Sequence, residues 1–312
     1  MSVSNKIVIA LGGNSLLRNG DVADYETQYR RSREALDSLV PILKDNNVVM
    51  THGNGPQVGN ILIQNESASS VPAMPLHSCG SMSQGLIAEF ITMAYASVRK
   101  SYGINKNMIQ IFTRTLVRGN DNAFSNPTKP IGPSYSKDEA LHFMNSKKWI
   151  MKEYQGKGWR RVVPSPEPVS ILETDGIMSV LNSGAIPLCV GGGGIPVVES
   201  DGDIIPVDAV IDKDLASSLL ATEIGADILM ILTDVDHVYV DFKKENQKQI
   251  GKISYAEMND LYSSGKFEDG SMGPKVKAAL NFIRNGGKTA FITSLDKGNA
   301  ALKEHFGTVI VP

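Results

Sequence analysis

The sequence is poor in cysteine and has no long apolar run. Its 312 residues include two cysteines, Cys79 and Cys189, which cannot build a disulfide framework and are too few for a structural zinc site. No segment approaches the roughly 18–20 consecutive apolar residues that a membrane-spanning helix needs. The polar residues 1–6 lead directly into a short apolar segment, so we expect no secretory signal. These absences predict a protein of the reducing cytoplasm.

The sequence also lacks an excess of charge of one sign. Its 31 lysine and arginine residues are balanced by 33 aspartate and glutamate residues, which gives a formal net charge of −2. This balance argues against a partner of nucleic acid or of an anionic membrane, because both need an extended basic surface. The hydrophobic share of 42% and the length suit one large α/β domain or two lobes.

Short β-branched segments alternate with longer segments of helical period. Residues 6–11 and 47–51 predict strands, and residues 25–45 between them predict an amphipathic helix. This order predicts an α/β fold, a three-layer αβα sandwich with a mainly parallel central sheet. Further strands are expected at 108–112, 186–190, 228–233, 289–293 and 308–311, and further helices at 82–99, 215–224, 255–263, 274–285 and 296–305.

One segment, residues 118–168, interrupts this order. It is polar, aromatic and rich in proline, and it contains a predicted short helix at 137–144 with strand-like pieces at 149–153 and 160–163. A structureless loop of this length is uncommon inside a compact domain, so we predict a small protruding subdomain. The expected organisation is a single domain over 1–312, with a first lobe over 1–185 that carries the insertion and a second lobe over 186–312.

Three glycine clusters directly follow predicted strands: Gly12-Gly13-Asn14, Gly53-Asn54-Gly55 and Gly191 to Gly194. Glycine lets the backbone turn tightly and aim several N–H groups at one anion, and a helix that begins just beyond adds its dipole. One such cluster alone would be an ordinary strand-to-helix turn. Ligands of parallel sheets bind at the carboxyl ends of the strands, so three clusters there favour a shared anion site.

The common phosphate-binding and nucleophile patterns do not occur. A Walker loop ending in Gly287-Lys288-Thr289 would need a glycine where Phe282 stands, and Pro196 after the third glycine cluster cannot donate an N–H. None of the five histidines pairs at a metal-ligand spacing or belongs to a serine–histidine–acid arrangement. His52 precedes a glycine cluster, where we expect it to make a structural hydrogen bond. These absences argue against a P-loop enzyme and a simple dinucleotide fold.

Lys213 stands between two carboxylates, Asp212 and Asp214, at the start of a predicted helix. Asp214 is the expected N-cap of that helix. An isolated triplet of this kind is more often a solvated charge cluster. Here it follows an apolar segment at the ligand-binding edge, where a neighbouring carboxylate would hold the ammonium group in place for a phosphate.

Two further lysines stand in stiff or glycine-rich surroundings. Lys275 follows Pro274, the expected first helical residue, in the segment 270–275 (GSMGPK). Lys129 lies between Pro127 and Pro130, which restrict the chain, although a proline-rich surface loop is as good an interpretation for this segment alone. Lysines and glycine loops without a nucleophile suit direct phosphoryl transfer, in which the protein positions two substrates and neutralises charge.

Segments along nearly the whole chain resemble the carbamate kinases of the amino acid kinase superfamily, in the same order. The superfamily shares the first glycine loop and the lysines, whereas the NPTKPIGP and WRRVVPSP segments resemble the carbamate kinases in particular. The segments are ALGGNSLL (10–17), THGNGPQVGN (51–60), NPTKPIGPSY (126–135), WRRVVPSPEP (159–168), GGGGIPVV (191–198), AVIDKDLAS (209–217), LTDVDHVYV (232–240) and GSMGPKVKAA (270–279).

The resemblance implies an amino acid kinase fold, a homodimer, and reversible transfer between carbamoyl phosphate and ADP that gives ATP and carbamate. It also implies Mg²⁺, with ligands left open, and a place in fermentative arginine catabolism. Lys213 would neutralise the phosphoryl oxygens, Asp212 would orient the lysines, Lys275 would reach the nucleotide phosphates, and Lys129 would reach the carbamoyl end. The implied phosphoryl and carbamoyl residues are Gly12, Gly13, Asn14, Gly53, Asn54 and Gly55, and the implied nucleotide residues are Thr233, Asp234, Val235, Tyr239, Met272, Gly273, Pro274 and Lys275.

Two residues depart from the family pattern: His77 stands in place of a common aspartate, and Asn246 in place of a frequent proline. Two alternatives stay open. The chain could be another kinase of the superfamily that phosphorylates a carboxylate, against which Lys129 and its subdomain argue. It could also be a non-catalytic nucleotide-binding sensor on the same fold, against which the three lysines argue.

Overall fold

The computed structural model describes residues 4–18, 20–154, 156, 158–242, 244–267 and 272–312, with the side chain of Asn14 left out. Within these ranges no helix is both long and apolar enough to cross a bilayer. The helices are α1 (Tyr25–Asp45), α2 (Gly55–Ser67), α3 (Leu76–Tyr102), α4 (Asn122–Ser125), α5 (Lys137–Ser146), α6 (Thr174–Asn182), α7 (Lys213–Glu223), α8 (Tyr255–Ser263), α9 (Met272–Arg284) and α10 (Gly298–Glu304), with 3-10 turns η1 (Gly13–Ser15), η2 (Gly191–Gly193) and η3 (Leu295–Lys297). The strands are β1 (Lys6–Leu11), β2 (Asn47–His52), β3 (Met108–Gln110), β4 (Arg114–Val117), β5 (Lys129–Tyr135), β6 (Met151–Tyr154), β7 (Gly158–Val163), β8 (Pro168–Ile171), β9 (Ile186–Cys189), β10 (Ile195–Ser200), β11 (Asp203–Pro206), β12 (Ile228–Thr233), β13 (Val238–Val240), β14 (Lys248–Ile250), β15 (Lys252–Ser254), β16 (Thr289–Ser294) and β17 (Thr308–Val311).

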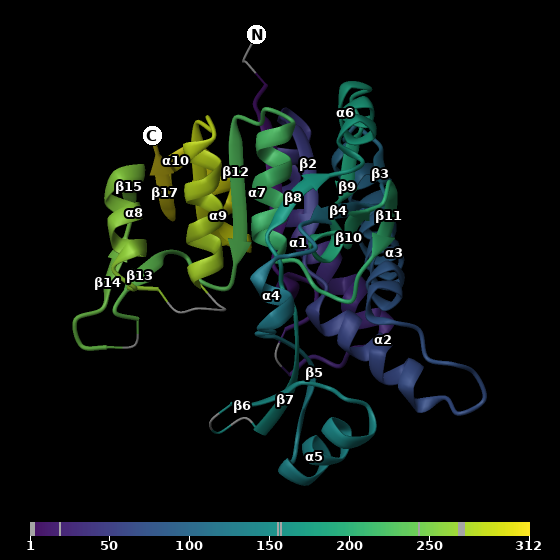
Figure 1. Cartoon of the computed structure of the whole chain (residues 1–312). Helices are drawn as coiled ribbons and strands as arrows, with labels where there is room; N and C mark the ends of the chain where they lie inside the picture. Colours follow the sequence, from purple (N-terminus) through teal and green to yellow (C-terminus); the bar gives the residue numbers. More distant parts are fainter. Residues whose placement is uncertain (1–3, 19, 155, 157, 243, 268–271) are drawn as a thin grey trace.

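An eight-stranded sheet in the order β15-β17-β16-β12-β1-β2-β9-β3 forms the centre of the molecule (Figure 1). Neighbouring strands run parallel, except β16 and β17, which are antiparallel. In the register of the sheet, Leu11 at the end of β1 pairs with Leu232 on one side and His52 on the other. The carboxyl ends of β12, β1 and β2 therefore lie next to one another.

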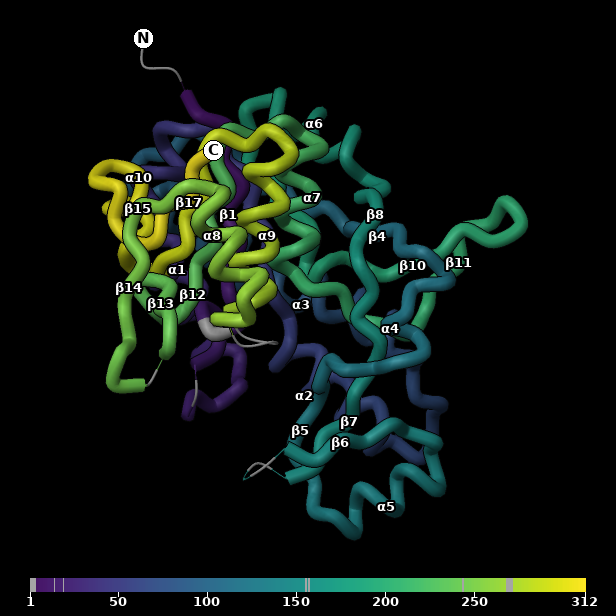
Figure 2. Tube along the Cα trace, turned by 60° about the vertical axis from the view of Figure 1, so that its left-hand side comes forward, coloured from purple at the N-terminus to yellow at the C-terminus, as the bar shows by residue number. Residues whose placement is uncertain are grey.

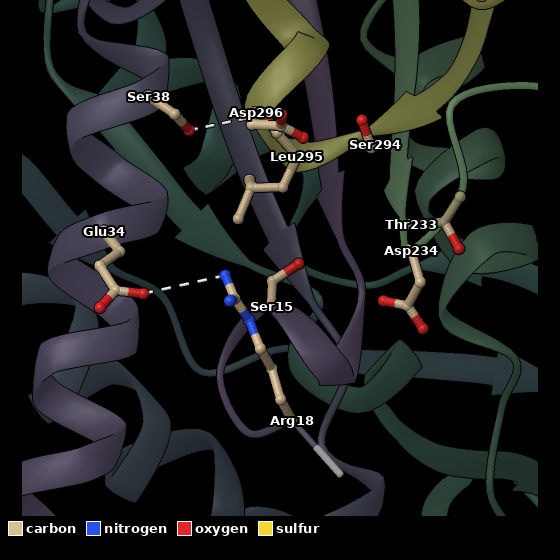
Figure 3. A pocket seen from close by; sticks show the side chains of 9 residues that line it. All are labelled: Ser15, Arg18, Glu34, Ser38, Thr233, Asp234, Ser294, Leu295 and Asp296. Atoms are coloured by element: carbon tan, nitrogen blue, oxygen red, sulfur yellow. Dashed lines mark hydrogen bonds and ion pairs between the residues drawn. The ribbon is translucent and has the colours of Figure 1, made fainter. Parts of the chain in front are cut away.

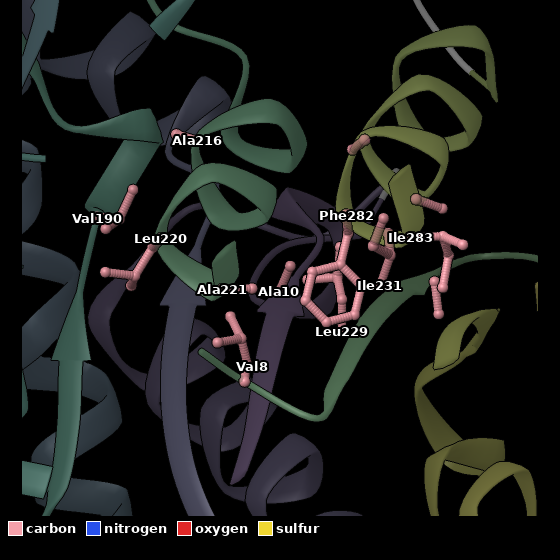
Figure 4. Close-up of a cluster of buried hydrophobic side chains, with 14 of the residues drawn as sticks. Val8, Ala10, Val190, Ala216, Leu220, Ala221, Leu229, Ile231, Phe282 and Ile283 are labelled. Atoms are coloured by element: carbon pink, nitrogen blue, oxygen red, sulfur yellow. The ribbon is translucent and has the colours of Figure 1, made fainter. Parts of the chain in front are cut away.

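Alternating side chains of the central strands enter two separate apolar cores. Val8 and Ala10 of β1 face a core shared with α7 and α9, whereas Ile7 and Ile9 face a core shared with α1 and α3. Figure 4 shows the first core, in which Leu220 of α7 and Phe282 of α9 lie over the sheet. A parallel sheet that is buried on both faces needs helices on both faces. The predicted αβα sandwich with a mainly parallel sheet is therefore confirmed.

The elements with a strong apolar period have the bounds that the sequence predicts. The strands β1, β12 and β17 and the helices α1 and α8 begin and end at the expected residues. Helix α3 begins at Leu76 instead of residue 82, because Leu76 and Cys79 are buried and extend its apolar face by more than a turn. No bounds were predicted for α2, because its start is rich in glycine and proline.

A separate three-stranded sheet, in the order β5-β7-β6, projects from the body together with α5 (Figures 1 and 2). We call residues 129–163 the protruding subdomain. Its predicted helix over 137–144 is present as α5, which begins with a capping box between Ser136 and Glu139. The strands β9 and β10, which follow residue 185, pair with β2, β3 and β4. The two-lobe division at residue 185 stays a prediction.

Candidate active site

The first two glycine clusters continue the central sheet. The N–H of Gly12 donates to the Leu232 carbonyl at 3.0 Å, and the N–H of Gly53 donates to the Leu11 carbonyl at 3.0 Å. Among the several N–H groups that the sequence predicts for an anion, those of Gly12 and Gly53 are therefore engaged within the sheet. Their glycine character serves close approach instead, since a Cβ on Gly53 would lie 3.2 Å from the nitrogen of Gly13.

Helix α7 begins beside these loops. Its N-cap is Asp212, whose Oδ1 accepts from the N–H of Asp214 at 2.9 Å. The expectation that Asp214 is the N-cap is wrong, because the helix begins at Lys213, so Asp214 already lies in its first turn. A hydrogen bond of 2.6 Å between the hydroxyls of Thr51 and Ser217 joins α7 to β2. As a result the side chain of Lys213 runs over Gly53, with its Cδ 3.3 Å from where a Cβ of Gly53 would be.

A cavity of about 240 Å³ at this edge, which we call the lysine cavity, gathers residues from distant parts of the sequence. Lysines line it from the protruding subdomain (Lys129), from α7 (Lys213) and from α9 (Lys275). Five other predicted site residues also line it: Gly13, Gly53, Asn54, Gly55 and Asp212. The structure thus brings most of the predicted phosphoryl and carbamoyl residues together, whereas Gly12 is not among the described lining residues.

The three lysines form ion pairs with two aspartates. Lys129 Nζ lies 2.8 Å from Asp212 Oδ2. Asp214 accepts hydrogen bonds from both other lysines, from Lys213 at Oδ1 and from Lys275 at Oδ2, the latter at 3.0 Å. The carboxylate that contacts both Lys213 and Lys275 is thus Asp214, whereas the sequence pattern left open which neighbouring aspartate holds Lys213. Within the described residues, Asp212 forms an ion pair with Lys129, whereas Lys213 and Lys275 pair with Asp214.

Burial and charge shift the titration of this cluster. Burial would raise the pKa of Asp214, but the charges and hydrogen bonds of Lys213 and Lys275 outweigh it and hold the pKa well below its ordinary value. Burial lowers the pKa of Lys213, an effect that Lys275 adds to and Asp214 opposes. Burial would also lower the pKa of Lys275, yet Asp214 outweighs it and raises that pKa. Asp214 is therefore the counter-ion that favours the charged form of both ammonium groups.

His52 is the last residue of β2 and directly precedes the second glycine cluster. Its Nδ1 lies 3.0 Å from the Gly53 carbonyl oxygen, which is the structural hydrogen bond expected from the sequence. Burial, followed by the charge of Lys213, lowers the pKa of His52 to about 4. The ring is therefore neutral at neutral pH, and the hydrogen on Nδ1 makes it the donor to Gly53.

A second cavity, of about 420 Å³, lies beyond Thr233 at the end of β12 and is called here the tyrosine cavity. The predicted nucleotide residues Thr233, Asp234, Val235, Tyr239 and Met272 all line it.

Met272 and Lys275 are three residues apart on α9, so one helix face reaches from the tyrosine cavity to the lysine cavity. Gly273 and Pro274 lie between them and are not among the described residues that line either cavity. Pro274 is the third residue of α9 rather than the first. Gly270 and Ser271 of the same predicted segment lie outside the described residues.

A third cavity, of about 740 Å³, lies on the α1 side of Thr233 and Asp234 (Figure 3). Its charged lining consists of one guanidinium, from Arg18, and the carboxylates of Glu34, Asp234 and Asp296. We call it the acidic cavity. Glu34 lies 3.8 Å from Arg18 and also pairs with Arg30 and Arg31. Because these arginines balance Glu34, the described lining of the acidic cavity has no excess of positive charge, whereas three lysines against two aspartates in the described lining of the lysine cavity favour a phosphate.

The third glycine cluster is packed rather than open. Gly192 lines the lysine cavity at φ +65°, but a Cβ there would lie 2.2 Å from the side-chain nitrogen of Asn54. A Cβ on Gly194 would lie 2.1 Å from the hydroxyl of Thr115. Asn54 is also held by Ser83, whose hydroxyl accepts from its amide at 2.8 Å. Glycine is therefore needed at Gly192 and Gly194 because Asn54 and Thr115 pack closely against them. The shared anion site predicted from the sequence gives a different reason for these glycines.

Replacing Gly192 with alanine is expected to lower the free energy of unfolding by about 2–4 kcal/mol, because it adds a steric clash to backbone strain. Gly202→Ala is the matched control: Gly202 has φ +88° and open space around its Cβ position, so only strain remains. Urea unfolding of both variants measures the difference. Equal losses would mean that the contact with Asn54 contributes nothing.

The two residues that depart from the family pattern form hydrogen bonds outside the lysine cluster. The backbone N–H of His77 donates to Asp208 Oδ1 at 3.2 Å, and Asn246 Nδ2 donates to Asp241 Oδ2 at 2.8 Å. Neither His77 nor Asn246 is among the described residues that line the lysine cavity. The two changes therefore leave the lysine cluster untouched.

Comparison with known proteins agrees with this geometry. The model of the amino acid kinase family matches residues 5–294. The carbamate kinase of Thermoplasma volcanium is 52% identical over 307 residues, which cover 98% of this chain and 99% of the relative, and that of Trichomonas vaginalis is 47% identical over 312 residues, which cover 98% and 99%. The solved structure of the carbamate kinase from Giardia lamblia bound to AMP-PNP has a TM-score of 0.93 at 43% identity and covers 100% of this chain and 99% of its own. The chain belongs to the amino acid kinase family, and within it to the carbamate kinases.

Proposed function

We propose that this chain transfers a phosphoryl group reversibly between carbamoyl phosphate and ADP, giving ATP and carbamate, at the junction of the lysine and tyrosine cavities. The observation that carries the proposal is the pair of lysines on Asp214. Lys213 Nζ and Lys275 Nζ bind the two oxygens of one carboxylate, so both ammonium groups point into the same small space. A phosphoryl group placed there would meet both charges at once.

The two cavities differ in the ligand that each suits. The lysine cavity is small, at about 240 Å³, and carries an excess of positive charge, which suits a compact acyl phosphate. The tyrosine cavity is larger, at about 420 Å³, and combines Tyr239, Phe242 and Phe267 with polar groups, which suits a nucleoside. We therefore propose that Gly53, Asn54 and Gly55 contact the carbamoyl group and that Thr233 to Val235 contact the nucleotide.

The proposed chemistry is a direct in-line transfer. A β-phosphate oxygen of ADP attacks the phosphorus of carbamoyl phosphate, the bond from phosphorus to the carbamoyl oxygen breaks, and carbamate leaves with the electron pair. The described lining of the lysine cavity contains no serine, cysteine or histidine, which favours transfer without a covalent enzyme intermediate. Lys213 would neutralise the oxygens of the phosphoryl group in flight, while Lys275 would hold the nucleotide phosphates and Gly13 and Asn14 would approach from the first loop.

Mg²⁺ is proposed as a companion of the nucleotide. Among the described residues there is no group of three or more histidine, cysteine, aspartate or glutamate side chains that could hold a metal ion. Mg²⁺ does not need such a group, because it usually keeps several waters and binds through substrate phosphates with one or two carboxylates. Asp234, which lines both the tyrosine and the acidic cavity, is the carboxylate that we propose for it. When bound, the ion would supply neutralisation of phosphate charge.

Three further proposals follow from membership of the family. We propose a homodimer, which is supported by exposed apolar side chains on and near α3 and β3, namely Met82, Met93, Tyr102, Ile109 and Phe112. We propose the cytoplasm as the compartment, because Cys79 and Cys189 are both free thiols. We propose ATP synthesis in fermentative arginine catabolism as the role, on the resemblance alone.

The activity is tested by mixing the purified chain with ADP, Mg²⁺ and carbamoyl phosphate and measuring ATP. Formation of ATP well above a blank that corrects for the spontaneous decay of carbamoyl phosphate is the expected result. ATP formation from a carboxylic acyl phosphate such as acetyl phosphate, but not from carbamoyl phosphate, would instead favour another kinase of the superfamily. Binding of ADP without turnover of either compound would favour a nucleotide sensor.

Replacing Lys129 with alanine is expected to raise KM for carbamoyl phosphate about tenfold or more, because an ammonium group at the acyl phosphate is lost. KM for ADP should stay within about twofold, since Lys129 lines only the lysine cavity of the two. Lys137→Ala is the matched control, because Lys137 is an exposed lysine on α5 of the same subdomain. Unchanged steady-state constants for carbamoyl phosphate in Lys129→Ala would remove the role proposed for Lys129.

A further inference from the structure

Helix α2 connects the lysine cavity to the protruding subdomain. Its first residues, Gly55 and Pro56, line the lysine cavity, and its last turn contains Glu66. Figures 1 and 2 show β5 of the subdomain close to the course of this helix. A displacement of the subdomain against α2 would therefore also displace Lys129 against the lysine cavity.

The contact between α2 and β5 is close. A Cβ on Gly59 of α2 would lie 3.3 Å from the Cα of Gly132 in β5. Around this point Ile131 and Val163 of the subdomain share one buried apolar cluster with Val58, Ile61 and Leu62 of α2. A glycine-to-glycine contact lets two backbones approach closely, but it has no polar group that fixes their relative rotation. The apolar cluster has none either.

Glu66 supplies a directional contact at the far end of this interface. Its Oε2 lies 2.6 Å from Lys147 Nζ, and its Oε1 lies 3.9 Å from Arg161 Nη1. The guanidinium of Arg161 and the ammonium of Lys147 lie 4.4 Å and 4.6 Å from the centre of the Trp149 ring. Glu66 is on the body, whereas Lys147, Trp149 and Arg161 are all in the subdomain. One body carboxylate thus meets two cations that are themselves ordered by an aromatic ring.

Glu66 and Lys129 act on the same rigid unit. Arg161 lies in β7 directly opposite Ile131 in β5, and Lys129 is two residues before Ile131 on that strand. At about 3.4 Å per residue, Lys129 lies only about 7 Å along the strand from the register position of Arg161. A contact that fixes Arg161 against α2 therefore fixes where Lys129 can reach.

We propose that Glu66 is a positioning residue that holds the protruding subdomain in the orientation in which Lys129 reaches Asp212 and the lysine cavity. This inference rests on the function proposed above for Lys129. Glu66 acts on the use of the acyl phosphate through Lys147 and Arg161. It lines neither the lysine cavity nor the tyrosine cavity in the described chain.

The test is Glu66→Gln, which keeps the size of the side chain and removes its charge. KM for carbamoyl phosphate is expected to rise about three- to tenfold, the effect of one partly exposed ionic cluster. KM for ADP and the melting temperature are expected to stay unchanged. Lys147→Gln should shift KM for carbamoyl phosphate in the same direction, and the double variant should show less than the sum of both effects.

The control is Asp37→Asn, which removes a carboxylate from an exposed pair with Arg33 on α1 and should change neither KM. An unchanged KM for carbamoyl phosphate in Glu66→Gln would overturn the inference. So would an equal rise of both KM values together with a lower melting temperature, because that pattern indicates a merely structural role. A wild-type chain without turnover of carbamoyl phosphate would overturn the proposed function instead.

A second measurement decides the inference independently of turnover. Spin labels on cysteines introduced at Lys137 in the subdomain and Arg33 in the body report the distance between the two parts. The distance distribution is expected to broaden in Glu66→Gln relative to the same labelled chain with Glu66. Identical distributions would overturn the positioning role whatever the substrate is.

Discussion

Replacing Lys213 with alanine is expected to lower kcat for ATP formation by about 10³-fold or more, while the dissociation constant of ADP stays within about threefold. The side chain of Lys213 runs over Gly53 and ends beside Asp214, and Lys213 lines the lysine cavity but not the tyrosine cavity. Its charge therefore acts on the phosphoryl group in transit and little on the bound nucleotide. Steady-state kinetics and calorimetric titration with ADP measure the two effects separately.

A loss of folding must be separated from this loss of catalysis. In Lys213→Ala, Asp214 keeps its ion pair with Lys275. Because Lys275 still balances Asp214, Lys213→Ala is expected to stay folded, and urea unfolding of this variant separates a loss of stability from the loss of kcat. Equal weakening of ADP binding and turnover in Lys213→Ala would mean that Lys213 only binds the nucleotide.

Replacing Asp214 with asparagine is expected to lower the free energy of unfolding by about 3–5 kcal/mol, the largest stability effect that we predict for this site. The side chain of Asp214 is 3% exposed and is the shared partner of Lys213 and Lys275. Without its charge, two like charges remain close together in a poorly solvated space. Urea unfolding at pH 7 measures the loss, and kcat should fall as well, because burial then favours a neutral Lys213.

The pH dependence of this stability difference has a definite sign. The pKa of Asp214 is lower in the folded chain than its ordinary value of 3.8, so folding favours the charged form. The stabilisation by Asp214 is therefore fully present above about pH 4 and is lost as the pH falls toward the folded pKa. The difference between wild type and Asp214→Asn should be constant from pH 7 to pH 5 and shrink below pH 4. A difference that grows on acidification would contradict the assignment of Asp214 as the charged partner.

The parts of the fold that local sequence patterns specify could be predicted well. Strand β1 and helix α1 have the expected bounds because an unbroken apolar period runs along each of them. The start of α7 was placed wrongly because Asp212 and Asp214 are equally good N-caps by residue type. In the structure Asp212 caps the backbone N–H groups of Asp214 and Leu215, whereas Asp214 contacts Lys275, 61 residues away, and no local pattern contains that contact.

The glycine clusters show the same limit. Their position after strands correctly indicated the edge of the sheet where the cavities lie. Whether a glycine there offers an N–H group or makes room for a neighbour depends on residues elsewhere, such as Asn54 beside Gly192 and Thr115 beside Gly194. The role of Glu66 could not be predicted from the sequence, because a glutamate near a helix end is common. Its proposed role depends on contacts with Arg161 and Lys147 across the interface.

The central claim is that Lys213, Lys275 and the first glycine loop converge on one phosphoryl group, and a crystal structure with ADP and an inert phosphoryl mimic tests it most directly. We predict the base near Tyr239 and the β-phosphate beside Lys275. We further predict both ammonium groups within about 3 Å of phosphoryl oxygens, the usual length of such a charge-assisted hydrogen bond. Phosphates that turn away from these lysines into the acidic cavity, toward Ser15 and Asp296 (Figure 3), would contradict the claim.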